Sequence, residues 1–205
     1  MPKKIKFMEN VQNKLNKFKR IVKENCKNKD FEYREWFVDD HLIIVERIAM
    51  ELCDIYKKAD RNIVFALVWF HDFGKSINQK NEYKITEKMG PKVMRNIGLP
   101  EDFINKVLKF WKRMEMKNKI DISKEPIEIQ IVSTADGASH FVGQFYPGFF
   151  SDEPKKGIEW VREELRQKIK TDWERKIVLP EVKETFKNRY LTTLEMLGKY
   201  PKKFI

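Results

Sequence analysis

The apolar residues of this chain recur at steps of three and four along almost its whole length, which is the spacing of amphipathic α-helices. The first stripe predicts a helix over about residues 8–28. The second predicts a helix that begins after Asp30, a residue type that often caps a helix N-terminus. From Arg61 to Phe70 the chain is apolar almost throughout, which predicts a central buried helix with Gly74 as its C-terminal cap.

The second half of the chain continues the helical pattern. Its one strand-like run, IEIQIV, lies inside a longer helical pattern entered at Pro126. The segment FYPGFFSDEPKKG, rich in aromatic and turn residues, predicts a loop. Further helices are expected over about 84–97 with a break near Gly90-Pro91, about 101–116, about 126–142, about 158–177 and about 180–197. The fold class predicted from these elements is all-α.

Length and composition limit how this pattern folds. The chain has 205 residues, the usual size of one domain. Hydrophobic residues make up 41% and aromatic residues 13%, enough to build a core and to exclude disorder over most of the chain. Because no repeat, low-complexity tract or linker divides the sequence, we expect a single domain over residues 1–205.

The charge balance is strongly basic, with a formal net charge of +11. Such an excess favours anionic partners: phosphates, nucleic acid or an anionic membrane surface. Lysine enrichment also marks the surfaces of hyperthermophile proteins, so the excess is equally compatible with the composition of a proteome. The charge alone does not choose between these explanations.

The cysteines and the apolar segments bear on the cellular setting. Cys26 and Cys53 have no zinc-binding spacing, and two cysteines do not make a secreted disulfide framework. No stretch approaches the roughly 18 apolar residues of a membrane span, and the basic N-terminus lacks an apolar core of the signal-peptide kind. We therefore expect a cytoplasmic protein that does not use a membrane.

The most informative polar residues interrupt apolar helices. His71 and Asp72 follow the apolar run of the central helix, where both are costly to bury unless they are paired or bind a cation. His41, in VDDHLIIV, and Asp136, in IVSTADGASHF, interrupt two other apolar segments. Two histidines and two carboxylates from three packed helices would form a site suited to manganese, iron, cobalt, nickel or zinc.

The order and spacing of these residues resemble those of the HD superfamily of metal-dependent phosphohydrolases. His41 is followed thirty residues later by His71-Asp72 in the sequence HDFGK, and Asp136 stands in an Ala-Asp-Gly context. The resemblance implies an HD-type helical bundle with its core at about 30–145 and further C-terminal helices at about 153–205 that pack on it. It also implies a divalent metal ion, magnesium included, held by His41, His71, Asp72 and Asp136, and hydrolysis of phosphate esters.

Departures from better-known branches narrow this expectation. Members with two or three metal ions have additional histidines between the His-Asp pair and the last aspartate, whereas residues 73–135 contain none. We therefore expect one metal ion. The cyclic-dinucleotide branch, which has further His and Gly-Tyr-Pro motifs, is disfavoured. The nucleoside monophosphatases and alarmone hydrolases are disfavoured because no glutamate closely follows the His-Asp pair.

Several other residues are candidates for the reaction. Asp72 or Asp136 is expected to orient a water activated by the metal. Lys75 is expected to stabilise charge on the phosphate oxygens or, as the alternative, to be a solvated lysine that interacts with the helix C-terminus. His140 lies one helical turn after Asp136 and is a candidate substrate-binding group, an outer-shell group, a further ligand or a hydrogen-bonded core histidine. Arg166, Lys170 and Lys176 are further candidates for binding a substrate phosphate. They lie in a segment dense in both charges, and such segments usually form a solvated helix face.

The leading hypothesis is hydrolysis of a phosphate ester of a small metabolite, a nucleotide first among them. The alternative is a basic nucleic-acid-binding protein or nuclease using the same metal site, favoured by the net charge and by the runs Lys3-Lys4 and Lys202-Lys203. A third hypothesis is a metal-bound structural or regulatory module without turnover. The stretch from Asp172 to Lys176 also resembles one in other HD proteins, which implies a place in the family's architecture without assigning a role.

Overall fold

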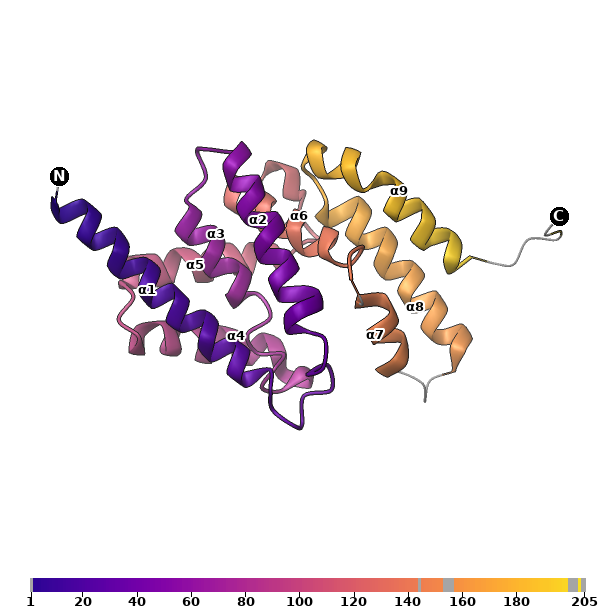
Figure 1. Cartoon of the computed structure of the whole chain (residues 1–205), viewed down its shortest axis with the longest axis horizontal. Helices are drawn as coiled ribbons and strands as arrows, with labels where there is room; N and C mark the ends of the chain where they lie inside the picture. The colour runs from indigo at the N-terminus through magenta and orange to yellow at the C-terminus, as the bar shows by residue number, and fades with distance from the viewer. Residues whose placement is uncertain (1, 144, 153–156, 199–202, 204–205) are drawn as a thin grey trace.

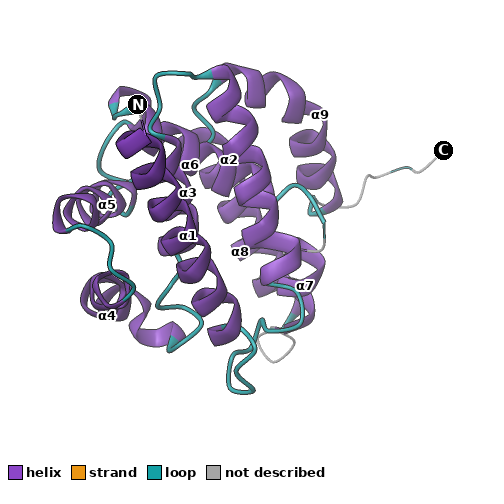
Figure 2. Cartoon of the chain, turned by 60° about the vertical axis from the view of Figure 1, so that its left-hand side comes forward, coloured by secondary structure: helices purple, strands orange, loops and turns teal. Residues whose placement is uncertain are grey.

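A computed structural model describes residues 2–143, 145–152, 157–198 and 203, and within these ranges all regular structure is helical (Figures 1 and 2). The all-α prediction is confirmed, and IEIQIV is part of a helix. The helices are α1 Pro2–Asn25, α2 Ile43–Ile55, α3 Arg61–Phe70, α4 Glu82–Asn96, α5 Glu101–Met114, α6 Ile127–Ser139, α7 Phe145–Asp152, α8 Ile158–Thr171 and α9 Pro180–Met196. Two π-helical turns, η1 Val38–Leu42 and η5 Asp172–Lys176, adjoin α2 and α8.

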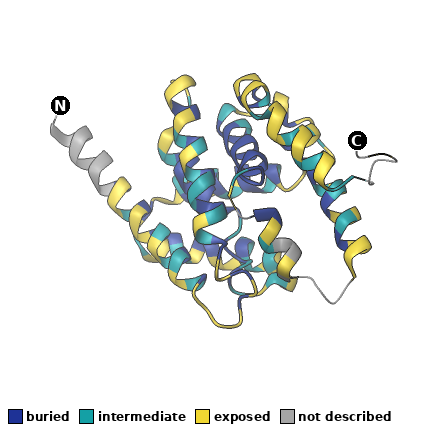
Figure 3. Ribbon diagram, turned by 45° about the vertical axis from the view of Figure 1, so that its right-hand side comes forward, coloured by how far each residue is buried: buried dark blue, intermediate teal, exposed yellow. Residues whose placement is uncertain are grey.

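Helices α3 and α6 form the centre of the bundle. Asp60 caps α3 by accepting hydrogen bonds from two backbone amides of its first turn, and all residues from Ile63 to Phe70 are buried. Helix α6 packs against α2, α3, α5 and η5, while α1 and α5 cover α3 from other sides. Figure 3 shows the buried segments gathered in the middle and exposed ones on the outer faces, α9 among them. Two of the candidate ligands thus lie on or directly after these central helices, Asp136 in α6 and His71 at the end of α3.

The N-terminal region differs from the prediction in where the second helix begins. Asp30 does not cap a helix: its own amide donates to the Asn28 side chain, and residues 32–37 form turns. These turns are held by packed aromatic rings, such as Phe31 against Phe37 with centroids 5.2 Å apart. Helical structure resumes only at Val38, in the π turn that carries His41.

Three further predictions from turn residues were wrong. Gly74 has no positive φ, so it is not a left-handed cap. Helix α4 runs unbroken through Pro91. Gly90 and Pro91 are both buried, and Gly90 packs so closely on Phe70 that a Cβ there would lie 2.5 Å from the ring. This packing outweighs the backbone hydrogen bond that Pro91 cannot donate. The segment predicted as a loop begins with α7. Pro147 is compatible with this helix because it lies in the first turn, where the backbone amide has no hydrogen-bond partner within the helix. Residues 153–156 of the segment lie outside the described residues.

Other expectations concern the membrane, the cysteines and the basic runs. Among the described residues, no helix combines the length and the apolar character needed to cross a bilayer. Cys26 and Cys53 are both buried and free. The side chains of Lys3 and Lys4, and all of Lys202, lie outside what the structure describes.

Candidate metal centre

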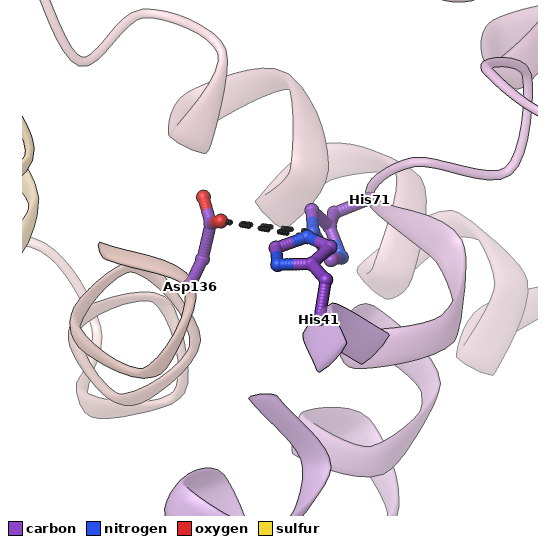
Figure 4. A group of neighbouring side chains, drawn as sticks. All are labelled: His41, His71 and Asp136. Carbon is purple, nitrogen blue, oxygen red and sulfur yellow. Dashed lines mark ion pairs between the residues drawn. The ribbon is translucent and has the colours of Figure 1, made fainter. Parts of the chain in front are cut away.

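The structure brings together the four residues predicted as ligands. His41 lies in η1, His71 follows the last residue of α3, Asp72 comes next, and Asp136 lies in α6. Ligand atoms of His41, His71 and Asp136 lie within 4.8 Å of one another. The Nε2 atoms of both histidines lie 3.3 Å from Asp72 Oδ2. Figure 4 shows the Asp136 carboxylate turned toward the two rings.

The backbone of α3 fixes the tautomer of His71. Its Nδ1 lies 2.7 Å from the Val68 carbonyl oxygen, which can only accept, so Nδ1 carries the proton. The other nitrogen, Nε2, therefore presents a lone pair. It is buried without a hydrogen-bond partner and faces Asp72 Oδ2, another acceptor. A buried, unpartnered acceptor of this kind is the geometry of a metal-binding histidine.

A hydrogen bond to a side chain fixes the same tautomer in His41. Its Nδ1 lies 2.9 Å from Ser139 Oγ, whose own proton is donated to the Asp136 carbonyl at 2.7 Å. The serine oxygen is thus left to accept from Nδ1–H, and His41 Nε2 presents a lone pair toward Asp72 and Asp136. Burial lowers the pKa of His41, which favours the neutral imidazole that a metal requires.

Each carboxylate divides its two oxygens between the histidines and a lysine. Asp72 Oδ2 faces the histidines and Oδ1 lies 3.0 Å from Lys75 Nζ. Asp136 Oδ1 lies 3.9 Å from His41 Nε2 and 4.0 Å from His71 Nε2, while Oδ2 lies 2.7 Å from Lys176 Nζ. Burial opposes ionisation, but Lys75 beside Asp72 and Lys176 beside Asp136 hold the pKa of each carboxyl well below its usual range.

The donor set fits a divalent cation. Two imidazole lone pairs and two carboxylate oxygens face one another with no donor among them, an arrangement that is repulsive until a cation or protons enter it. In the metal-free chain, burial lowers the pKa of His71, but Asp72 and Asp136 outweigh burial and raise it overall. A metal ion and a proton therefore compete for His71 Nε2, so that metal affinity falls as pH falls.

His140 extends the cluster toward the C-terminal helices. Its Nδ1 donates to Asp172 Oδ2 over 2.7 Å, and its Nε2 lies 3.4 Å from Asp136 Oδ1. Burial lowers the pKa of His140 to about 3, against the opposing pull of Asp172, so the ring is neutral and its Nε2 is a third lone pair beside the site. Lys168 also binds Asp172, at 3.0 Å, and burial lowers the pKa of this lysine to about 8.

The cluster lies in a cavity of about 540 Å³. One wall of this cavity is aromatic and consists of Tyr33, Trp36, Phe37 and Phe145. Gln79 also lines it and donates to the Tyr33 hydroxyl over 2.9 Å. The cavity thus joins a polar, charged floor to an apolar wall.

Of the five residues proposed from sequence to bind substrate, the cavity contains three: Lys75, His140 and Lys176. The structure does not bring Arg166 and Lys170 there. The Arg166 guanidinium binds Glu163 and the Leu197 carbonyl, and Lys170 is half-buried away from the cavity lining. Lys168 and Asp172 also line the cavity, although Lys168 was not among the residues expected from the sequence and no particular role was expected for Asp172.

We expect Ser139→Ala to weaken metal binding. The substitution removes the oxygen that accepts from His41 Nδ1–H, and loss of such an outer-shell partner costs about 10–100-fold in metal affinity. The measurement is calorimetric titration of metal-free protein with Mn²⁺, with the exposed Ser123→Ala as the control. Equal affinity in both variants would show that Ser139 does not orient the His41 ring.

Comparison with known proteins bears directly on this cluster. Residues 38–139 match the family model described as the HD domain. The match begins in the π turn that holds His41 and ends three residues after Asp136, so it encloses all four candidate ligands. No curated protein and no solved structure matches the chain.

Proposed function

The chain belongs to the HD domain family through residues 38–139, a family whose members are in general metal-dependent phosphohydrolases, and from this premise we propose that it hydrolyses a phosphate ester of a small metabolite. The observation that carries the proposal is the group of lone pairs and carboxylates from His41, His71, Asp72 and Asp136 at the floor of a cavity. A nucleotide is the substrate that we place first.

The proposed roles of the residues follow from their positions. His41, His71, Asp72 and Asp136 would hold one divalent ion, which, when bound, acts as a Lewis acid on the phosphoryl group and lowers the pKa of water. Asp72 faces that position and orients the attacking water. Lys75, which binds Asp72 through one N–H, has further N–H donors for a phosphoryl oxygen. The water oxygen would form a bond to phosphorus, the ester P–O bond would break, and the leaving alkoxide would depart as an alcohol with a proton that the water supplies.

The charges that line the cavity support an anionic substrate. Four lysines and five acidic residues face it: Lys75, Lys117, Lys168, Lys176, Asp72, Glu82, Glu115, Asp136 and Asp172. With neutral histidines, this lining has one negative charge in excess, and one divalent ion changes its net charge to +1. A bound ion would therefore make the cavity attractive to a phosphate.

The aromatic wall supports a substrate with a planar group. Trp36 packs edge-on against Phe145 with ring centroids 5.3 Å apart, and Tyr33 lies 5.2 Å from Trp36. Rings of this kind stack with the flat faces of nucleobases, and the Gln79 amide beside them can donate to or accept from a base edge. This wall is our reason for placing a nucleotide ahead of a sugar phosphate.

A metal-supplemented activity screen tests the proposal. Purified protein with Mn²⁺, Co²⁺, Zn²⁺ or Mg²⁺ is assayed against nucleoside mono-, di- and triphosphates, sugar phosphates and a generic aryl phosphate. We expect metal-dependent release of phosphate, with the highest kcat/KM for a nucleotide. Sugar phosphates cleaved with equal kcat/KM would contradict the choice of nucleotides, and the absence of metal-dependent release from every compound would contradict the proposed hydrolysis.

We expect Lys75→Ala to lower kcat by about 100-fold, since preorganised charge at the reacting phosphate typically contributes this much. Lys80→Ala, an exposed lysine five residues later, is the control and should retain full activity. The same proteins are tested for binding to duplex DNA at increasing salt. Unchanged turnover in Lys75→Ala, together with duplex binding that survives about 0.2 M salt, would instead favour the nucleic-acid alternative.

A further inference from the structure

The π turn η5 begins 33 residues beyond the end of the family match and places two charged groups against the candidate metal centre. Lys176 is only 6% exposed. Its Nζ lies 2.7 Å from Asp136 Oδ2 and 3.1 Å from Asp172 Oδ1. A lysine buried to this degree is costly unless its charge is matched, and here two carboxylates match it.

We propose that Lys176 is a positioning residue that fixes Asp136 for one-oxygen ligation of the metal ion, an inference that rests on the metal-dependent function proposed above. By holding Oδ2, Lys176 leaves Oδ1 alone to face the histidine nitrogens. Rotation of the carboxylate would break the contact with Nζ. Asp136 therefore neither turns away from the site nor engages an ion with both oxygens.

The other carboxylate is held in the same way from the opposite side. Lys75 binds Oδ1 of Asp72 and leaves Oδ2 to the histidines, so each candidate ligand has one lysine behind it. The two lysines differ in exposure. The Lys75 side chain is 24% exposed and open to a substrate, whereas that of Lys176 is 8% exposed and occupied by two carboxylates. This difference assigns Lys176 to positioning rather than to gripping a substrate phosphate.

The chain builds a rigid support for Lys176 along one face of α6. Gly137 permits the close approach, because a Cβ there would lie 2.9 Å from Lys176 Cβ and 3.2 Å from the Asp172 carbonyl oxygen. The Ser133 and Thr134 hydroxyls donate to the Lys176 carbonyl at 3.3 and 3.4 Å. Side chain and backbone of Lys176 are therefore both tied to the helix that carries Asp136.

Asp172 links this arrangement to His140. Its Oδ1 binds Lys176 and its Oδ2 accepts from His140 Nδ1–H, so one turn orients both Asp136 and His140. A π-helical turn adds one residue per turn, and such turns occur frequently at functional sites. The C-terminal helices thereby complete a metal centre whose candidate ligands all lie in the family-matched region.

The test compares the Mn²⁺ affinity of Lys176→Met, Lys176→Gln and Lys176→Arg by calorimetry without substrate. The control is Arg175→Met, which removes the neighbouring exposed cation of the same turn. We expect Lys176→Met to bind Mn²⁺ about 10–100-fold more weakly, as for other outer-shell partners, with Lys176→Arg closest to the wild type and Lys176→Gln between them. Arg175→Met should bind as the wild type does.

The outcomes separate this inference from the proposed function. A wild-type protein that binds no Mn²⁺ contradicts both. Wild-type affinity in a folded Lys176→Met variant, with helical content checked by circular dichroism, overturns the positioning role alone. If the Met variant does not fold, Lys176→Gln decides in the same way, because a purely structural lysine would change the melting temperature without changing the affinity of the folded protein.

Discussion

Substitution of Asp72 by alanine is expected to abolish metal binding and phosphate release while leaving the helical fold intact. Asp72 Oδ2 lies 3.3 Å from the Nε2 atoms of both His41 and His71, so its removal takes away a candidate ligand at the centre of the cluster. The loss of affinity should exceed the roughly 100-fold that outer-shell changes cost. Since the side chain is 15% exposed and fills no part of the apolar core, helical content should not change.

Thermal unfolding measures this effect without a substrate. At a metal concentration 100 times its dissociation constant, a bound ion stabilises the wild type by about 2.7 kcal/mol, or about 5–10 °C in Tm for a chain of this size. Asp72→Ala should show no such rise, whereas the control Asp39→Ala, an exposed carboxylate in η1, should show all of it. An equal rise in Asp72→Ala would mean that the ion binds elsewhere.

We also expect Gly74→Ala to destabilise the protein and to lower its activity together. A Cβ at this position would lie 2.1 Å from the backbone carbonyl oxygen of Glu82 and 2.7 Å from Thr86 Oγ1. The Gly74 amide donates to that same hydroxyl at 2.9 Å, so the loop bearing Asp72 and Lys75 lies directly on α4. Overpacking of this kind costs about 2–3 kcal/mol, or about 5–10 °C in Tm.

A double variant distinguishes the backbone contact from the side-chain contact. Thr86→Ala removes the hydroxyl that the new Cβ would meet but leaves the Glu82 carbonyl in place, so Gly74→Ala should still lower Tm when it is added to Thr86→Ala. Thr86→Ala alone is the reference for this comparison, because it leaves the Gly74 amide without its acceptor and is itself destabilised. If adding Gly74→Ala to Thr86→Ala leaves Tm unchanged, the threonine hydroxyl, not the α4 backbone, requires glycine at position 74.

The four candidate ligands could be selected from the sequence because they are polar residues that interrupt or directly follow apolar runs. His71 and Asp136 stand out in this way, and burying them without a partner is expensive. Turn residues were less informative. Asp30, Gly74 and Pro91 are residue types that commonly begin or end helices, but tertiary packing, which the local sequence does not show, decides their conformation here.

The C-terminal residues were harder to select because α8 is dense in charges of both signs. The buried stripe of α8 is Val161, Leu165 and Ile169. Lys168 and Asp172 lie three and seven residues after Leu165, hence on this face, whereas Arg166 and Lys170 each follow a stripe residue and point about 100° away from it. The phase of the apolar stripe was the available signal for preferring Lys168. The phase of this stripe does not indicate which other helix packs against that face of α8.

A crystal of the protein grown with Mn²⁺, with diffraction recorded at a wavelength where manganese scatters anomalously, tests the central claim most directly. The account predicts one anomalous peak per chain, about 2.0–2.3 Å from the Nε2 atoms of His41 and His71 and from oxygens of Asp72 and Asp136. A peak bound by other residues, or no peak within reach of these four side chains, would contradict it.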